Sequence, residues 1–144
     1  MGTDQLLVIE HAGLLLPVGA VHDGQMPEEA AKAVLRLEPD GIHVLRRVAV
    51  DQRQPTRRRK VITHIVATKP LAPDDIVRLT YRDPRAAIRV IPLGQVTAHL
   101  PPCAHRRTLA ALNALEQDKT AYLDSGTIRR TEPSASRLTE HSWQ

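Results

Sequence analysis

Aromatic residues are almost absent from this sequence of 144 residues, which holds two tyrosines, one tryptophan and no phenylalanine. We therefore expect a core of Leu, Val, Ile and Ala, and few surfaces on which nucleic-acid bases could stack. The single cysteine, Cys103, excludes an internal disulfide and a zinc site built from cysteines. No apolar stretch reaches the roughly 18 residues of a membrane span, and residues 1–20 lack the pattern of a signal peptide. These absences predict a cytoplasmic protein without membrane contact.

Lysine is also scarce, because 16 of the 20 basic residues are arginines. Against 16 acidic residues they give a net charge of +4. The planar guanidinium group binds phosphate through two parallel hydrogen bonds, so this bias suits a phosphate-bearing ligand. A genome that favours arginine codons would produce the same bias, and the composition alone does not decide between the two explanations.

The order of apolar runs and turn residues predicts a mixed α+β chain. Residues 5–10 and 14–16 form an expected hairpin, and Pro27 with two glutamates begins an expected helix over residues 27–38. A second helix is expected over residues 103–117, with leucines at a spacing of three as its core face. The remaining β-branched runs predict strands at residues 42–50, 61–68, 76–82 and 88–93.

The same pattern of apolar runs and turn residues predicts the domain boundaries. We expect one domain over residues 1–120, with the helices packed on a mixed sheet. Residues 121–144 form the expected C-terminal extension, partly disordered because the chain from Thr131 onward is polar and contains Pro and Ser.

The segment from residue 14 to residue 41 resembles the Nudix box of the MutT-like Nudix superfamily. Leu16-Pro17-Val18-Gly19 matches the strand end of the box with one glycine replaced, Gly24 matches its second glycine, and Ala30-Ala31 matches its alanine pair. The resemblance covers roughly residues 5–115 and implies a Nudix-like α/β/α sandwich with a mixed sheet and two main helices. It also implies a ligand with a nucleoside-diphosphate character.

The departures from this family pattern concern the carboxylates that hold magnesium. His22 and Gln25 stand where the family has two glutamates, and Ala33, Val34 and Leu37 replace further residues of the motif. Glu38 alone is retained, and one carboxylate is a poor site for Mg²⁺, which needs six oxygen ligands. We therefore expect no metal, or Glu38 as its ligand if there is one, and loss of the usual Mg²⁺-dependent diphosphate hydrolysis.

Other polar residues are candidates for ligand binding. The expected binding residues are Gly19, Gln25, Arg57, Arg58, His64 and Arg82. Arg57 and Arg58 belong to the densest basic run, which could hold a diphosphate or a nucleic-acid backbone, or could be a solvated hairpin tip. No helix-turn-helix or RNA-module signature accompanies the run, so sequence-specific nucleic-acid recognition is not expected. Residues His22 and Glu38 are the catalytic candidates if chemistry occurs.

Three classes of function stay open at this point. The first is a degenerate Nudix-like domain that binds a nucleotide-like or other phosphorylated small molecule without hydrolysing it. The second is a Nudix-type hydrolase of diphosphate-containing substrates with a non-canonical site using His22 and Glu38, for which Mg²⁺ would be the cofactor. The third is a scaffolding or dimerisation module, which would form a homodimer.

Overall fold

A computed structural model of the chain describes residues 5–11, 13–39 and 41–134. The architecture is mixed α+β, with several sheets and four helices in the described part. The chain divides into two compact units. Unit 1 comprises Met1–Arg46 and Thr68–Leu100, and unit 2 comprises Arg47–Ala67 and Pro101–Gln144. No described helix is both long and apolar enough to cross a lipid bilayer.

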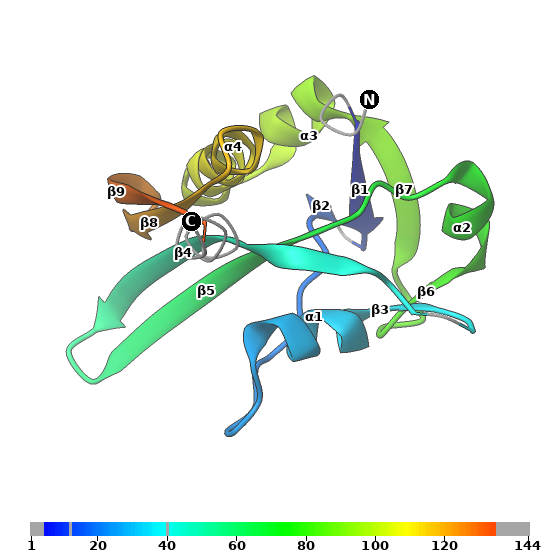
Figure 1. Ribbon diagram of the computed structural model, residues 1–144, viewed down its shortest axis with the longest axis horizontal. Coiled ribbons are helices and arrows are strands. Elements are labelled where there is room, and N and C mark those ends of the chain that lie inside the picture. The colour runs from blue at the N-terminus through cyan, green and yellow to red at the C-terminus, as the bar shows by residue number, and fades with distance from the viewer. Residues whose placement is uncertain (1–4, 12, 40, 135–144) are drawn as a thin grey trace, which may run out of the picture. The chain divides into compact units, whose positions relative to one another are not determined.

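One sheet of unit 1 contains the predicted N-terminal hairpin. Strands β1 (Gln5–Glu10), β2 (Leu14–Leu15) and β7 (Ala87–Pro92) are antiparallel in the order β2-β1-β7 (Figure 1). Val8 and Ile9 of β1 are almost completely buried, as is Val96 of helix α3 (Leu93–His99). The hairpin prediction is confirmed, whereas helix α3 was not predicted.

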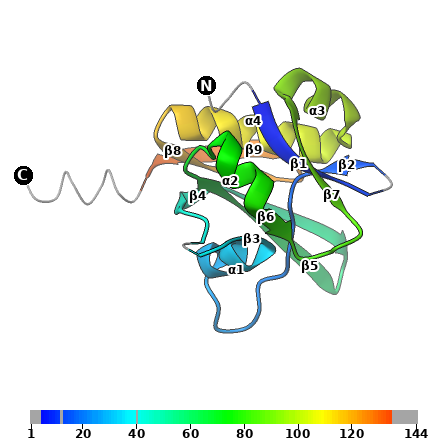
Figure 2. The same ribbon diagram turned by 90° about the vertical axis from the view of Figure 1, so that its right-hand side faces the viewer.

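The second part of unit 1 corrects two of the sequence predictions. Helix α1 (Pro27–Val34) ends four residues before the predicted end, and β3 (Leu35–Leu37) follows it directly. Strand β3 pairs with β6 (Leu79–Tyr81), as Figure 2 shows. Leu35 and Leu37 are half-buried on either side of the exposed Arg36, and this period of two favours a strand over a last helical turn.

The predicted strand at residues 76–82 is wrong over its first three residues. Helix α2 (Pro73–Arg78) occupies them, and β6 begins only at Leu79. Proline at the first helical position, followed by Asp74 and Asp75 in the first turn, favours this short helix. The apolar run IVRLTY is therefore divided between two elements.

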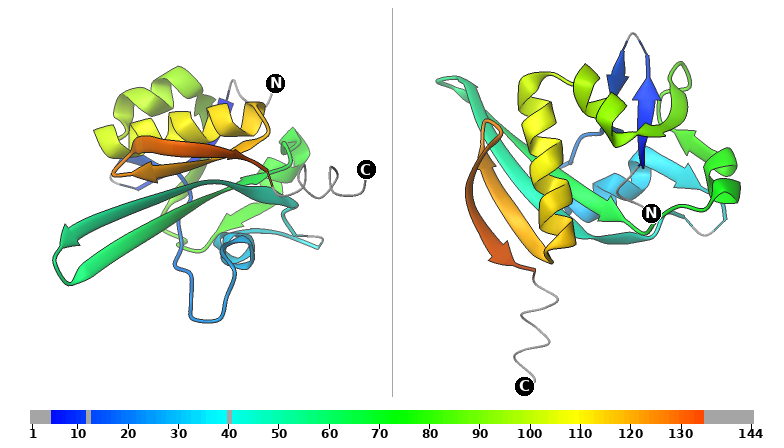
Figure 3. Two further views of the ribbon diagram at one scale, coloured as in Figure 1. Left: turned by 60° about the vertical axis from the view of Figure 1, so that its left-hand side comes forward. Right: turned by 90° about the horizontal axis from the view of Figure 1, so that it is seen from above.

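Unit 2 contains most of a four-stranded mixed sheet with the order β5-β4-β8-β9. Its strands are β4 (Val44–Thr56), β5 (Arg59–Thr68), β8 (Lys119–Asp124) and β9 (Thr127–Pro133). β4 and β8 are parallel, and β8 and β9 are antiparallel. The predicted second helix is confirmed as α4 (Pro102–Glu116), which lies along β8 (Figure 3).

The chain beyond residue 120 differs from the expected extension. Residues 121–133 belong almost entirely to β8 and β9, because Ala121 and Leu123 are buried in the core of unit 2 and β9 pairs along β8. Alternating burial along β8 supplies the reason, since it is the pattern of a strand with one face on a core. The rest of the predicted extension, residues 135–144, lies outside the described residues.

The face of α4 that packs on the sheet is made of alanines and not of the predicted leucines. Ala110, Ala111 and Ala114 are buried against Val48 and Ala49 of β4, whereas Leu109 is 44% exposed. Small side chains let a helix approach a sheet closely, and the leucines then lie at the margins of the contact. Leu115 still packs against this core from its edge.

Candidate functional site around Tyr81

The loop of residues 16–26, here called the box loop, is held by a side chain from β6. The hydroxyl group of Tyr81 donates a hydrogen bond to the carbonyl oxygen of Val18 (3.1 Å) and lies 3.4 Å from the amide nitrogen of the same residue, which donates to it. Tyr81 is 8% exposed. Both polar groups of one loop residue are therefore fixed by a buried phenol, which gives this loop a defined backbone.

Arg82 binds the same loop residue through one nitrogen only. Its Nε donates to the Val18 carbonyl oxygen, its backbone N–H donates to the carbonyl of Val34 at the end of α1, and its guanidinium lies 5.4 Å from the centre of the Tyr81 ring. The side chain is exposed, and its two terminal amino groups bind no acceptor within the described chain. Arg82 therefore presents two terminal amino groups with four N–H donors, and a positive charge, beside the box loop.

Gly19 and Val34 pack so closely that neither position is open for a larger group. A Cβ atom built on Gly19 would lie 2.6 Å from Cγ2 of Val34. Val34 occupies a position at which the Nudix resemblance implies a carboxylate. At this position the chain has a methyl group packed against the loop, so the side chain supports the backbone and offers no oxygen to a cation.

The predicted residues His22 and Gln25 form a turn. The amide N–H of His22 donates to Oε1 of Gln25 (3.1 Å), and the amide N–H of Gln25 donates to the carbonyl of His22 (3.0 Å). Gln25 therefore closes this turn through its own side chain. The imidazole of His22 is on an exposed residue.

Glu38 follows β3 and does not lie on a helix, which corrects its predicted placement. Its carbonyl oxygen accepts a hydrogen bond from Nη1 of Arg78 (2.7 Å), and the residue is exposed. No hydrogen bond or ion pair joins Glu38 to His22 in the described chain. The two catalytic candidates are therefore not linked as an acid–base pair.

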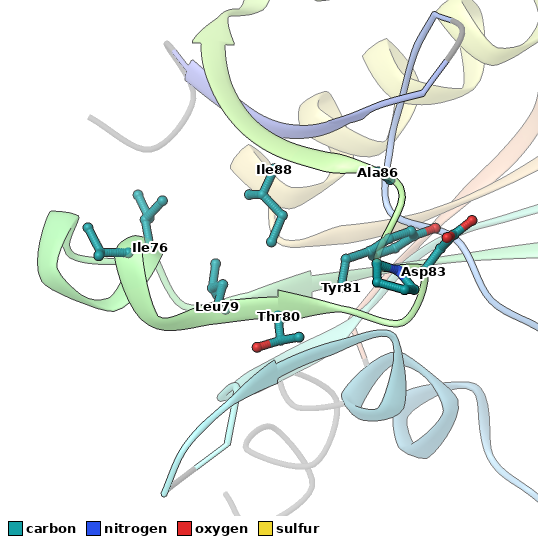
Figure 4. A pocket seen from close by; sticks show the side chains of 9 residues that line it. Ile76, Leu79, Thr80, Tyr81, Asp83, Ala86 and Ile88 are labelled. Atoms are coloured by element: carbon teal, nitrogen blue, oxygen red, sulfur yellow. The ribbon is translucent and has the colours of Figure 1, made fainter.

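A pocket of about 570 Å³ lies beside Tyr81 in unit 1. Figure 4 shows its walls, which come from α2, β6 and β7 and the turn between them. Most of the lining is aliphatic, with Tyr81 and two further polar residues; the principal residues are Ile76, Leu79, Thr80, Tyr81, Asp83 and Ile88. The pocket is open to solvent, and its walls offer apolar surface with a few polar groups.

The carboxylate at this pocket is already neutralised by a neighbouring arginine. Asp83 accepts hydrogen bonds from Nε and Nη2 of Arg85 (both 3.2 Å) and from its amide N–H (3.0 Å). The side-chain and backbone hydrogen bonds from Arg85 hold the pKa of the Asp83 carboxyl below its ordinary value, and the pair raises the pKa of Arg85. Arg85 is therefore engaged, in contrast to Arg82.

The remaining predicted binding residues belong to unit 2. Arg57 and Arg58 form the exposed turn between β4 and β5, and His64 is half-buried on β5. The structure thus places Gly19 beside Arg82, with Gln25 in a separate turn of the same loop of unit 1, and assigns the other three to a different unit. Within the described ranges, no three His, Cys, Asp or Glu side chains gather as a metal site.

Tyr81 is the central residue that sequence reasoning missed. It belongs to both the box loop contact and the pocket wall, but in the sequence it is part of a short apolar run before a turn. The available signal was that the chain has only two tyrosines, so a phenol is a rare polar group among its aliphatic side chains.

In comparisons with known proteins, no family model, no curated protein and no solved structure matches this chain.

Proposed function

We propose that this protein binds a nucleotide-like or otherwise phosphorylated small molecule and does not hydrolyse it by the metal-dependent route of the Nudix superfamily. The observation that carries the proposal is Arg82, whose terminal amino groups are free beside a fixed loop backbone. A guanidinium that is already oriented by Nε binds a phosphate with less loss of side-chain entropy than a free one.

In this proposal, the pocket holds the part of the ligand that is not phosphate. Tyr81 contacts the box loop through its hydroxyl and lines the pocket, so the loop and the pocket share one residue. Aliphatic walls with Thr80 suit a heterocyclic or sugar-like group that buries apolar area and makes a few hydrogen bonds. Arg85 compensates Asp83 and thereby limits the repulsion that this carboxylate would exert on an anionic ligand.

The proposed fold relation is a Nudix-like α/β/α sandwich whose box has lost its metal-binding carboxylates. Support comes from the hairpin β1–β2 before the box loop and from α1 after it. Val34 packs against Gly19 and Gln25 closes a turn, so two positions of the motif serve the backbone instead of a cation. A cytoplasmic location is part of this proposal, and the one cysteine is a free thiol.

Thermal unfolding of the full chain with inorganic pyrophosphate, adenosine and adenosine diphosphate, each with and without Mg²⁺, tests the proposal. We expect the diphosphate to stabilise the protein, by about 2.7 kcal/mol at a concentration of one hundred times Kd. Arg82→Gln should weaken binding by at least about tenfold, because a charge-assisted hydrogen bond is lost.

Arg89→Gln is the matched control, since it removes the same charge from another arginine of unit 1, which is paired with Glu10 and does not line the pocket. We expect it to bind nearly as the unmodified chain does. Mg²⁺-dependent turnover that Glu38→Gln abolishes would instead establish the hydrolase. Indifference to all three ligands together with a concentration-dependent dimer would establish the scaffold.

A further inference from the structure

The hairpin of β4 and β5 continues beyond the sheet of unit 2. Only residues Ala49–Gln52 of β4 pair with β8, although β4 runs to Thr56. Residues 53–60, here called the basic ribbon, therefore form a two-stranded end with no third strand beside β4, which Figure 1 shows as the far end of β4 and β5. A two-stranded ribbon buries little surface and contributes little stability by itself.

The basic ribbon concentrates positive charge, and the carboxylate of Asp124 lines the same hollow as Arg53 and Lys60 at its base. Five of its eight residues are basic, all five are exposed, and none makes an ion pair with any described residue; they are Arg53, Arg57, Arg58, Arg59 and Lys60. Side-chain Nε2 of Gln54 donates to the carbonyl of Arg57 (3.2 Å) and closes the turn. The arginines thus project from a backbone that is internally hydrogen-bonded.

Mutual repulsion makes such a cluster unfavourable unless an anion neutralises it. Unit 2 as a whole carries 12 basic and 6 acidic residues, so the ribbon lies on the positive part of the molecule. The cluster therefore favours a partner with several negative charges.

We propose that the basic ribbon binds the phosphate backbone of double-stranded DNA without sequence specificity. A two-stranded β-ribbon fits the major groove of B-DNA, which is about 12 Å wide, and its arginines then reach the phosphates on both sides. DNA presents one negative charge per about 1.7 Å of helix axis, so a ribbon with five cations meets several phosphates at once.

Other occupants fit this surface less well. The hollow at the base of the ribbon is about 110 Å³ and contains the carboxylate of Asp124, which is small and unfavourable for a mononucleotide. Single-stranded nucleic acid needs aromatic platforms, and the ring of Tyr122 in this unit is covered by the Arg130 guanidinium at 4.5 Å. Pro55 and the like charges disfavour strand pairing with a second copy at this edge.

Fluorescence anisotropy of a labelled 20-base-pair duplex with the full chain, over a salt range of about 50 to 200 mM, tests the proposal. The logarithm of the binding constant should fall linearly with the logarithm of salt concentration, with a slope of about −0.9 for each phosphate contacted. Changing Arg57, Arg58 and Arg59 to Gln together should weaken binding at least about tenfold at the lowest salt and reduce the slope by about 2.7.

Two further variants decide how that loss is interpreted. Arg36, Arg85 and Arg89 changed to Gln together give the same net charge but lie in unit 1, and this control should bind as the unmodified chain does. Lysine at positions 57, 58 and 59 should retain most of the affinity and of the salt slope, because the charges remain.

The proposal is overturned by any of four results: no binding to the duplex, tighter binding to a single strand of the same length, equal loss in the unit 1 control, or loss in the lysine variant as large as in the glutamine variant. Adenosine diphosphate in excess should not displace the duplex. This test is independent of the proposed small-molecule site, since Arg82→Gln should leave duplex binding unchanged.

Discussion

Unit 1 carries 8 basic and 10 acidic residues, whereas unit 2 carries 12 basic and 6 acidic residues. The net charge of unit 1 is therefore −2 and that of unit 2 is +6. The two units thus have net charges of opposite sign, although the whole chain is +4. In unit 1 three arginines form ion pairs: Arg78, Arg85 and Arg89 pair with Asp75, Asp83 and Glu10, respectively. In unit 2 the five cations of the basic ribbon have no such partners.

The abundant arginines of this protein therefore have two different roles, as members of ion pairs in unit 1 and as unpaired charges in the basic ribbon of unit 2. An exposed ion pair contributes little stability, but it removes a free charge from the surface and so reduces attraction for anions. Unit 1 pairs three of its arginines in this way and leaves the terminal amino groups of Arg82 without an acceptor among the described residues, whereas unit 2 leaves the five cations of the basic ribbon without an ion pair there. We infer that the two units favour anions of different kinds, a small phosphorylated ligand and a polyanion.

The interiors of the two units differ as well. Unit 2 contains a buried charge, because Asp51 is 2% exposed and accepts hydrogen bonds from Nε of Arg107 (2.8 Å) and the amide N–H of Gly126 (3.1 Å). Unit 1 has no buried charged residue among those described, and its loop is held by the neutral hydroxyl of Tyr81. A buried ion pair is sensitive to the loss of one member, since the other is left without its partner.

The largest effect that tests this difference is expected for Asp51→Ala. We expect the free energy of unfolding of unit 2 to fall by about 3–5 kcal/mol, because Arg107 and the Gly126 amide lose their acceptor. Hydrogen exchange should accelerate in β4, β8 and α4 but not in β1 and β7. Asp124→Ala removes an exposed carboxylate and should cost less than about 1 kcal/mol. Equal acceleration in both units would show that they unfold together.

A smaller effect is expected for Gly19→Ala in unit 1. The new Cβ atom would lie 2.6 Å from Cγ2 of Val34, and the repacking should cost about 1–3 kcal/mol in a chemical denaturation experiment. Val34→Ala in the same chain should relieve part of this cost, so the double variant should be more stable than the sum of the single changes predicts. Gly94→Ala has open space around it and is the control. Additive costs in the double variant would contradict the packing argument.

The smallest effect concerns the pH dependence of the Asp83–Arg85 pair. The pKa of Asp83 is lowered in the folded chain, so the pair stabilises the protein above the ordinary pKa of a carboxyl and loses this contribution as the pH falls through the lowered value. Arg85→Gln should return the pKa toward its ordinary value, as measured by an NMR titration of the Asp83 carboxyl. Arg89→Gln, whose partner is Glu10, should leave the Asp83 titration unchanged.

Local sequence patterns predicted those elements that depend on local chemistry. The hairpin of β1 and β2, the start of α1 at Pro27 and the extent of α4 follow from apolar runs, proline position and turn residues. The predictions failed where a short apolar run is compatible with either a helix or a strand. Residues 35–37 form a strand in place of a last helical turn because β3 pairs with β6, 42 to 46 positions further along the chain. Residues 76–78 belong to α2, which begins at a proline followed by two acidic residues.

The candidate site was predicted in part. The sequence indicated the box loop and Arg82, but Tyr81, the pocket and the displacement of Glu38 from the helix depend on the pairing of β6 with β3. The leucine spacing of α4 predicted the wrong core face, because the sheet of unit 2 accepts alanines at close approach. Such a choice depends on the shape of the opposing surface and has no local signal.

By itself, the sequence determined the charge, the scarcity of aromatic side chains and the basic run at residues 57–60. These are properties of residues and their order. Only the tertiary structure decided which cations are paired, since an ion pair such as Arg89 with Glu10 joins residues 79 positions apart. The physical reason is that free charge depends on neighbours in space, and strand pairing and packing select those neighbours.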